Sequence, residues 1–400
     1  MTATDSPVRD PNRFVPERAQ EAGGSMHAGP IQARTRQLPR RLQRVLRSRV
    51  VDLATTPHGV DHYLSMVNPL WSLDRTRALL VDRIRETHDV TTLVLDPGPA
   101  WGPHEAGQHV RTQVDIDGRR RTRYFTISSS PRRADGLITL TVKAGDDAFV
   151  SRFLQTHARP GLVLEISEPR GEFVLPSPLP DHLLFIGGGS GITPLMSMTR
   201  TLLADGYRGR ITFLNYVKTP ADRIFAAELD RIDAHHDRVT LVTVCSEEDG
   251  DPDTLCGYLE QGHLDQVAPD WREAPAYVCG PPPMLDAAEA IWEEAGALDR
   301  FHIERFTLAA PSADVNAEGC VKLADSDIEL ANDGRPLLVQ AEEAGLEPEY
   351  GCRMGICKTC TTRKVKGVTQ SLTTGEVSSD DDQDIQICVN VALGDVELAL

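Results

Sequence analysis

The stretch Tyr350-Gly351-Cys352-Arg353-Met354-Gly355-Ile356-Cys357-Lys358-Thr359-Cys360 lies near the C-terminus, and a fourth cysteine follows 28 positions after Cys360. The pattern C-x4-C-x2-C…C is the ligand spacing of a [2Fe–2S] cluster. Two irons that share two sulfides need four thiolates from different directions, so three come from one tight loop and the fourth from a separate segment. Glycines suit such a loop because they tolerate left-handed backbone angles and close approach. The predicted ligands are Cys352, Cys357, Cys360 and Cys388.

Two other uses of these cysteines are a zinc site and a pair of disulfides. Zinc ribbons favour two C-x2-C pairs rather than an x4 gap, and disulfides belong to oxidising compartments. The N-terminus has no apolar signal segment, and no apolar run approaches the ~18 residues of a membrane span. We therefore expect a cytoplasmic protein, with a peripheral position at the inner face of the membrane as a second option.

Length and charge limit the number of domains and the kinds of partner molecule. A length of 400 residues predicts two to three domains. The net charge of −17 argues against a nucleic-acid partner, because binding there requires neutralisation of phosphates. From Asp314 onward the chain has seventeen acidic and seven basic residues. Such an acidic face would steer a basic partner protein, or it would only keep the protein soluble.

Residues 1–75 form a predicted N-terminal extension. Its start is rich in Pro, Gly, Ser and charge and predicts disorder. Residues 38–51 combine an apolar stripe with five arginines, the pattern of a basic amphipathic helix. That helix could contact an anionic membrane or an acidic partner, or pack on the body of the protein. A second helix is expected before Asn68-Pro69.

Residues 76–180 predict an antiparallel β-barrel, because short alternating segments are separated by turns rich in Pro, Gly and Asp. The expected strands are 91–95, 109–116, 122–127, 137–143 and 163–166.

Residues 181–307 predict a parallel α/β domain. An apolar strand at 182–186 runs through a glycine-rich turn into a helix at 195–203, and a second strand follows at 211–217. Glycines at a helix N-terminus let the backbone approach a pyrophosphate. The candidate residues of this turn are Gly187, Gly188, Gly189, Gly191 and Thr193.

Four motifs carry a resemblance to known families. The cysteine stretch resembles ferredoxins. Arg123-Tyr124-Phe125-Thr126 resembles the R-x-Y-[S/T] signature of the ferredoxin–NADP reductase superfamily, and Gly107-Gln108 resembles its G-Q strand start. The run from Cys279 to Met284 resembles its C-G-P-x-x-M motif. The resemblance covers residues 76–400. It implies an antiparallel FAD-binding β-barrel, a parallel α/β NAD(P)-binding domain and a β-grasp-like [2Fe–2S] ferredoxin domain at 313–400.

The resemblance also implies roles for single residues. Arg123 would pair with the flavin phosphate, Phe125 would lie against the isoalloxazine, and Thr126 would bond the flavin N5 edge. The family usually has Tyr at the position of Phe125, so the stacking face is kept and a hydroxyl is lost. Ser151, at a helix start, would contact the FAD pyrophosphate, although serine there is often only a helix cap. Further expected contacts are Cys279, Gly280, Pro281 and Met284 at the nicotinamide and Phe306 near the flavin, with Thr126 and Cys279 as the catalytic pair.

Coenzyme choice is expected to depend on Lys218 and Arg223. No acid directly follows the strand at 211–217 to take a ribose 2′-hydroxyl, and two cations lie close in the sequence. This pattern favours a 2′-phosphate, and hence NADPH over NADH. The same residues could be ordinary surface charges.

The implied activity is an electron relay from NADPH through FAD and the [2Fe–2S] cluster to a terminal acceptor. The run from Val67 to Asp74 resembles actinobacterial reductases that serve di-iron fatty-acyl desaturases, so a desaturase is the first expected acceptor. The alternative is a cytochrome P450 or ring-hydroxylating oxygenase. A different class would be a redox-sensing interaction protein, whose cofactors report a redox state rather than deliver electrons.

Overall fold

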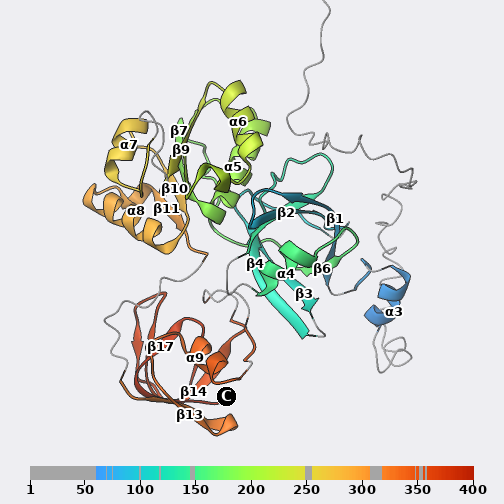
Figure 1. The fold of residues 1–400 in the computed structure, drawn as a ribbon, viewed down its shortest axis with the longest axis vertical. Coiled ribbons are helices and arrows are strands. Elements are labelled where there is room, and N and C mark those ends of the chain that lie inside the picture. Colours follow the sequence, from blue (N-terminus) through green and yellow to red (C-terminus); the bar gives the residue numbers. More distant parts are fainter. Residues whose placement is uncertain are drawn as a thin grey trace, which may run out of the picture.

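The structure is a computed structural model that describes residues 60–68, 70–73, 75–98, 101–116, 119–144, 149–247, 255–306, 318–346, 348–350, 355 and 358–400. The predicted basic helix at 38–51 and the predicted ligands Cys352 and Cys357 lie outside these residues. Among the helices that the structure describes, none is long and apolar enough to cross a membrane. Three sheets form the framework of the described residues (Figure 1).

The first sheet is antiparallel and nearly closed, in the order β4-β3-β6-β1-β2-β5. A bridge between Ile127 and Leu140 joins its two edges, and α4 packs on β4 and β5. In β3, buried residues alternate with more exposed ones, so every second side chain enters the barrel core. The elements are β1 Thr76–Arg85, β2 Val90–Asp96, β3 His109–Ile116, β4 Arg119–Thr126, β5 Ile138–Lys143, α4 Phe149–His157 and β6 Val163–Ile166.

The second sheet is parallel, in the order β11-β10-β7-β8-β9. The central strand β7 reads as a continuous apolar run because both its faces are covered. Leu183 and Phe185 enter a core with α5 and α6, whereas Leu184 and Ile186 enter a second core with α7 and α8. The elements are β7 His182–Gly188, α5 Ile192–Ala204, β8 Arg210–Val217, α6 Ala226–His235, β9 Val239–Cys245, α7 Gln261–Val267, β10 Ala276–Cys279, α8 Pro282–Glu294 and β11 Phe301–Glu304.

The third sheet is mixed, in the order β13-β12-β17-β14-β15, and β16 also pairs with β14. Strands β12 and β17 run parallel, and the buried residues Leu337, Leu338 and Ala341 of α9 pack into its core. The elements are β12 Cys320–Leu323, β13 Ile328–Ala331, α9 Leu337–Glu343, β14 Thr361–Ser371, β15 Val377–Ser378, β16 Gln383–Gln386 and β17 Asn390–Leu398. The predicted fold class of barrel, parallel α/β domain and β-grasp-like domain is confirmed.

A short helix, α3 (Val60–Val67), precedes the barrel. It ends just before Asn68, as the sequence predicts. Val60 and Leu64 form a small cluster with Trp71 and Leu73, and the carboxylate of Asp61 accepts a hydrogen bond of 2.8 Å from the Leu73 N–H.

Candidate flavin, nicotinamide and cluster sites

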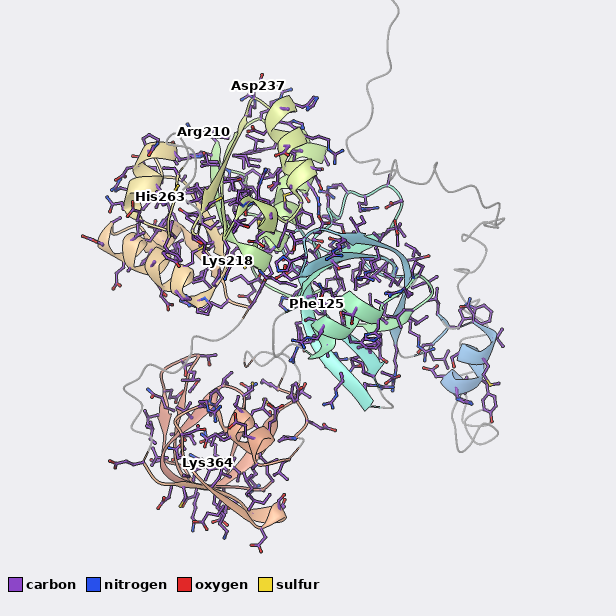
Figure 2. The ribbon with its side chains drawn as sticks, viewed as in Figure 1. Phe125, Arg210, Lys218, Asp237, His263 and Lys364 are labelled. Atoms are coloured by element: carbon purple, nitrogen blue, oxygen red, sulfur yellow. The ribbon has the colours of Figure 1, made fainter. Side chains whose placement is uncertain are left out.

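The predicted flavin residues lie together on β4. Phe125 is half-buried and pairs with Val110 of β3, and Thr126 pairs with His109 (Figure 2). The Thr126 side chain is buried, yet within the part of the chain that the structure describes its Oγ1 has no hydrogen-bond partner. Because an unmatched buried hydroxyl is costly, a bound group that bonds this oxygen is favoured. The residue present at this position therefore fits the flavin edge that the sequence predicts.

The start of β3 is held against the second domain by Gly107. Its φ is +99°, and a Cβ at this position would lie 2.0 Å from the Phe173 carbonyl oxygen and 2.7 Å from Cε of Met198 in α5. Only glycine allows this approach. The predicted pyrophosphate contact Ser151 is buried in the first turn of α4, which packs on β4 and β5.

The predicted pyrophosphate turn and the predicted nicotinamide motif meet in the structure. A Cβ on Gly191 would lie 2.1 Å from the Cys279 carbonyl oxygen and 2.6 Å from the Gly280 nitrogen. Thr193 stabilises the same turn, because its Oγ1 donates a hydrogen bond of 2.9 Å to the Ser190 carbonyl. Segments that are about 90 positions apart in the sequence thus form one surface.

The other residues of these two segments also pack closely against each other. A Cβ on Gly188 would lie 2.8 Å from both Sδ of Met284 and Cδ of Pro281. Gly189 has φ +53°, a backbone conformation that favours glycine. Gly187 lies under α5, where a Cβ would be 3.1 Å from Leu195. Phe306 packs against the core cluster that also contains Cys279.

An acid that the sequence analysis missed links the two domains beside this surface. Glu304 on β11 is the register partner of Cys279, and its Oε1 lies 3.6 Å from Nδ1 of His109 on the barrel. Burial raises the pKa of Glu304, while the hydrogen bond from His109 opposes that shift. Burial, and then the charge of Glu304, raise the pKa of the Cys279 thiol well above its ordinary value, so the thiol stays neutral. The only signal in the sequence was an acid two residues before Phe306.

Both predicted coenzyme cations already have acidic partners. Lys218, labelled in Figure 2, follows β8 and lies 3.0 Å from Glu247 with 68% of its side chain exposed. Arg223 donates a hydrogen bond of 2.6 Å to Asp230. Exposed ion pairs are weak, so a phosphate can replace such an acid. Nε of Arg223 is buried and has no hydrogen-bond partner among the described residues. This donor fits an added anion.

A third cation near the glycine turn was missed as well. Nζ of Lys143, at the end of β5, would lie 3.8 Å from a Cβ on Gly189 and pairs with Asp89 at 3.4 Å. It brings a positive charge from the barrel to the turn where a pyrophosphate is expected. The sequence offered no signal, because a lysine at a strand end is usually only a surface residue.

In the third domain the last two predicted cluster ligands lie close together. Cys360 and Cys388 are both buried, and the Ile387 N–H donates a hydrogen bond of 3.3 Å to the Cys360 carbonyl. Gly355, with φ +76°, packs so tightly that a Cβ there would lie 3.1 Å from both methyl groups of Val389. A loop segment, the third cysteine and the fourth cysteine therefore converge, which fits a cluster with four thiolate ligands.

Helix α5 connects the nicotinamide turn to the flavin strand. It begins directly after Gly191, and its side chains bond the segment that follows β4. Oγ of Ser197 donates to the Ser129 carbonyl at 2.7 Å, and the hydroxyls of Ser130 and Thr201 lie 2.9 Å apart. Arg200, which lies between Ser197 and Thr201 on the helix, donates to the Ser128 carbonyl. The two cofactor-binding segments are thus held in one rigid arrangement.

This geometry defines the class of protein: a reductase with a hydride-transfer site between two domains and a one-electron centre on a third. Three family models match in that order. They are an oxidoreductase FAD-binding domain at residues 78–175, an oxidoreductase NAD-binding domain at 185–290 and a 2Fe-2S iron-sulfur cluster binding domain at 321–392. The chain belongs to the ferredoxin–NADP reductase superfamily, in the group that carries a C-terminal [2Fe–2S] ferredoxin domain. It is an NAD(P)H-dependent oxidoreductase with FAD and [2Fe–2S] cofactors.

Individual relatives agree with this placement. The chain is 37% identical over 350 residues to a protein of Mycobacterium tuberculosis named NADPH oxidoreductase, with 86% of this chain and 89% of that protein covered. It is 31% identical to the glycine betaine monooxygenase reductase subunit of Chromohalobacter salexigens, over 78% of this chain and 92% of the other. Phthalate dioxygenase reductase has the same fold, with a TM-score of 0.54, 23% identity and coverage of 82% and 98%.

Replacing Gly191 with Ala should weaken coenzyme use, because the new Cβ would meet the Cys279 backbone on the facing segment. Overpacking of this kind costs about 1–3 kcal/mol, so kcat/KM for NADPH should fall roughly 5- to 150-fold in a ferricyanide reduction assay. The matched control is Gly102→Ala, where a Cβ meets nothing within 4 Å. Unchanged kcat/KM in a flavin-loaded Gly191→Ala protein would contradict the proposed contact.

Replacing Glu304 with Gln should change how stability depends on pH. A carboxyl with a raised folded-state pKa binds its proton more tightly when folded, so its contribution is present below pH 4.5 and is lost as pH rises through the folded pKa. Midpoints of thermal unfolding should therefore fall less for Glu304→Gln than for wild type as pH rises from 4.5 to neutral. The exposed Glu273→Gln serves as control. Parallel curves for wild type and Glu304→Gln would refute the buried carboxyl's effect.

Proposed function

We propose that the protein takes electrons from NADPH and delivers them through its cluster to an oxygenase-type acceptor protein. One observation carries this proposal. The Gly191 and Cys279 segments meet beside the Glu304–His109 link to the flavin barrel, whereas Cys360 and Cys388 lie in a separate domain. Entry and exit of electrons therefore have separate places in the chain.

The residues of the first two domains would bind FAD and NADPH and orient the two cofactors toward each other. The FAD that these residues would hold would supply a two-electron acceptor for hydride that can release electrons singly, and the predicted cluster cysteines would hold a one-electron acceptor. We assign Arg123 to the flavin phosphate, Phe125 to the ring face and Thr126 to the N5 edge. Cys279 supplies a small neutral side chain that leaves room for the nicotinamide and excludes water. Glu304 and His109 would hold a proton at the domain boundary.

A preference for NADPH is supported by Lys218 and Arg223, whose acidic partners are exposed or solvent-facing and can yield to a 2′-phosphate. Nε of Arg223 offers a further donor. The relative from M. tuberculosis is also named as an NADPH oxidoreductase.

For the acceptor, the relatives favour an oxygenase over the fatty-acyl desaturase that the N-terminal sequence suggested. A reductase subunit of a monooxygenase is similar to this chain over most of its length. The P450 and ring-hydroxylating systems fall in the same class, and the desaturase remains the special case to be tested against them. A purely sensory role is disfavoured, because the hydride-transfer site and the cluster site are both built in one chain.

Removing one cluster ligand should separate the two half-reactions. Cys388→Ser should abolish the iron–sulfur absorbance and the reduction of cytochrome c by NADPH, while ferricyanide reduction at the flavin persists. Cys320→Ser, on β12 outside the cluster motif, is the matched control. If ferricyanide reduction fell equally in a flavin-loaded Cys388→Ser protein, the proposed order of electron flow would be wrong.

Removing one of the two predicted coenzyme-binding cations should weaken the use of NADPH but not that of NADH. Arg223→Ala deletes a charged hydrogen bond worth about 1.5–3 kcal/mol, so KM for NADPH should rise about tenfold or more, while KM for NADH stays nearly constant. Arg231→Ala on the neighbouring helix α6 is the control. Equal increases for both coenzymes would remove Arg223 from the 2′-phosphate site.

The acceptor class can be tested directly with NADPH-driven turnover of purified oxygenase, P450 and desaturase components in parallel. We expect the oxygenase class to be reduced fastest. A run with and without anionic liposomes, using full-length protein and a variant lacking residues 1–52, tests the membrane option. Desaturase turnover alone, dependent on residues 1–52, would replace the oxygenase proposal with the desaturase one.

A further inference from the structure

A cation–π contact joins the third domain to the flavin strand. Cζ of Arg123 on β4 lies 5.4 Å from the centroid of the Tyr350 ring. A guanidinium within about 6 Å of an aromatic centroid is attracted by the ring's quadrupole. Tyr350 precedes the predicted ligand Cys352 by two residues, a span of at most about 7 Å along a chain. The contact therefore connects the strand of the predicted flavin site to the start of the cluster loop.

Tyr350 is anchored in its own domain. Its side chain packs against the hydrophobic core that contains Leu338, Cys360 and Cys388. The ring is therefore fixed relative to the part of the domain that holds the predicted cluster ligands Cys360 and Cys388. A side chain with this support restricts the orientation of the whole domain, which a loose surface tyrosine would not do.

Arg123 is equally well placed on the other side. Residues two apart on a strand point to the same face, so Arg123 and Phe125 share one face of β4. The planar guanidinium can stack through its face while its N–H edge binds an anion. Arg123 can therefore meet Tyr350 and serve the predicted flavin phosphate at the same time.

Charge supports the same approach of the two domains. Strand β4 carries arginines at positions 119, 120, 121 and 123, whereas the chain from Asp314 onward has seventeen acidic and seven basic residues. Opposite charges guide two surfaces toward one orientation, and a short-range contact then selects it.

We propose that Tyr350, through its contact with Arg123, docks the ferredoxin-type domain on the flavin strand and so sets the path from flavin to cluster. This inference rests on the proposed function, because it presumes that electrons leave through the cluster. Tyr350 is a positioning residue in this scheme: it carries no electron and no proton, and its ring orients the cluster domain.

The test compares Tyr350→Leu, which removes the ring, with Tyr350→Phe, which keeps it. In stopped-flow experiments on the full-length holoprotein, we expect the rate of electron transfer from flavin to cluster to fall roughly 2- to 30-fold for Tyr350→Leu and to be restored in Tyr350→Phe. Small-angle X-ray scattering should show a larger radius of gyration for Tyr350→Leu alone. Tyr63→Leu on α3, where Tyr63 is 45% exposed, controls for loss of an aromatic residue.

Other measurements keep the outcomes distinct. Cluster absorbance and ferricyanide reduction should match wild type in every variant, which excludes misfolding of the loop. If Tyr350→Leu leaves both the transfer rate and the radius of gyration unchanged, the docking inference is overturned while the proposed function stands. If wild type itself fails to pass electrons from flavin to cluster, the proposed function fails first.

Discussion

Arg200 of α5, held by Glu228 of α6, links the coenzyme domain to the flavin barrel through its hydrogen bond to Ser128. Arg200 donates from Nε and Nη2 to the two Glu228 oxygens at 2.8 and 2.6 Å, and only 18% of its side chain is exposed. Its third nitrogen donates to Ser128, just beyond the flavin strand. Removing one partner of a buried charge pair strands the other charge, at a cost of about 3–5 kcal/mol. The position of the glycine turn relative to Thr126 therefore depends on this guanidinium.

The same network reaches the segment that is expected to bind the adenosine ribose. The Arg200 guanidinium lies over the Phe225 ring at 4.6 Å, and the Phe225 N–H donates to Glu86 on the barrel side at 3.3 Å. Phe225 has φ +59°, an uncommon conformation for a bulky residue. Such strain persists only where the surroundings over-determine it. Arg223 lies two residues before Phe225. The contacts at the domain interface therefore also determine the position of this predicted coenzyme-specificity residue.

Local patterns made much of this architecture predictable. The strands β3 and β6 have the bounds that the alternation of apolar residues predicted, and the glycine turn leads from β7 into α5 as expected. The cofactor motifs were visible because each is a short run with a strict chemical requirement. Chemistry that depends on contacts distant in the sequence was not visible. No motif in the neighbouring sequence marks Glu304, Lys143 or Arg200 as functional. The role of each depends on a residue that it contacts on another domain.

The described contacts at the two domain junctions can be compared with what the two transfers require. Hydride transfer needs reacting atoms in a narrow geometry with water excluded. Accordingly, at the junction of barrel and coenzyme domain Arg200, which Glu228 holds in place, donates to Ser128, and hydroxyl contacts through Ser197 and Thr201 lie beside it. A single electron crosses without forming a bond, so its path needs closeness but no exact alignment of atoms. Among the contacts of the described residues at the second junction, a half-buried arginine lies over a tyrosine ring. If the cluster domain turns from the flavin toward an acceptor protein, this contact between Arg123 and Tyr350 is one that the turn has to break.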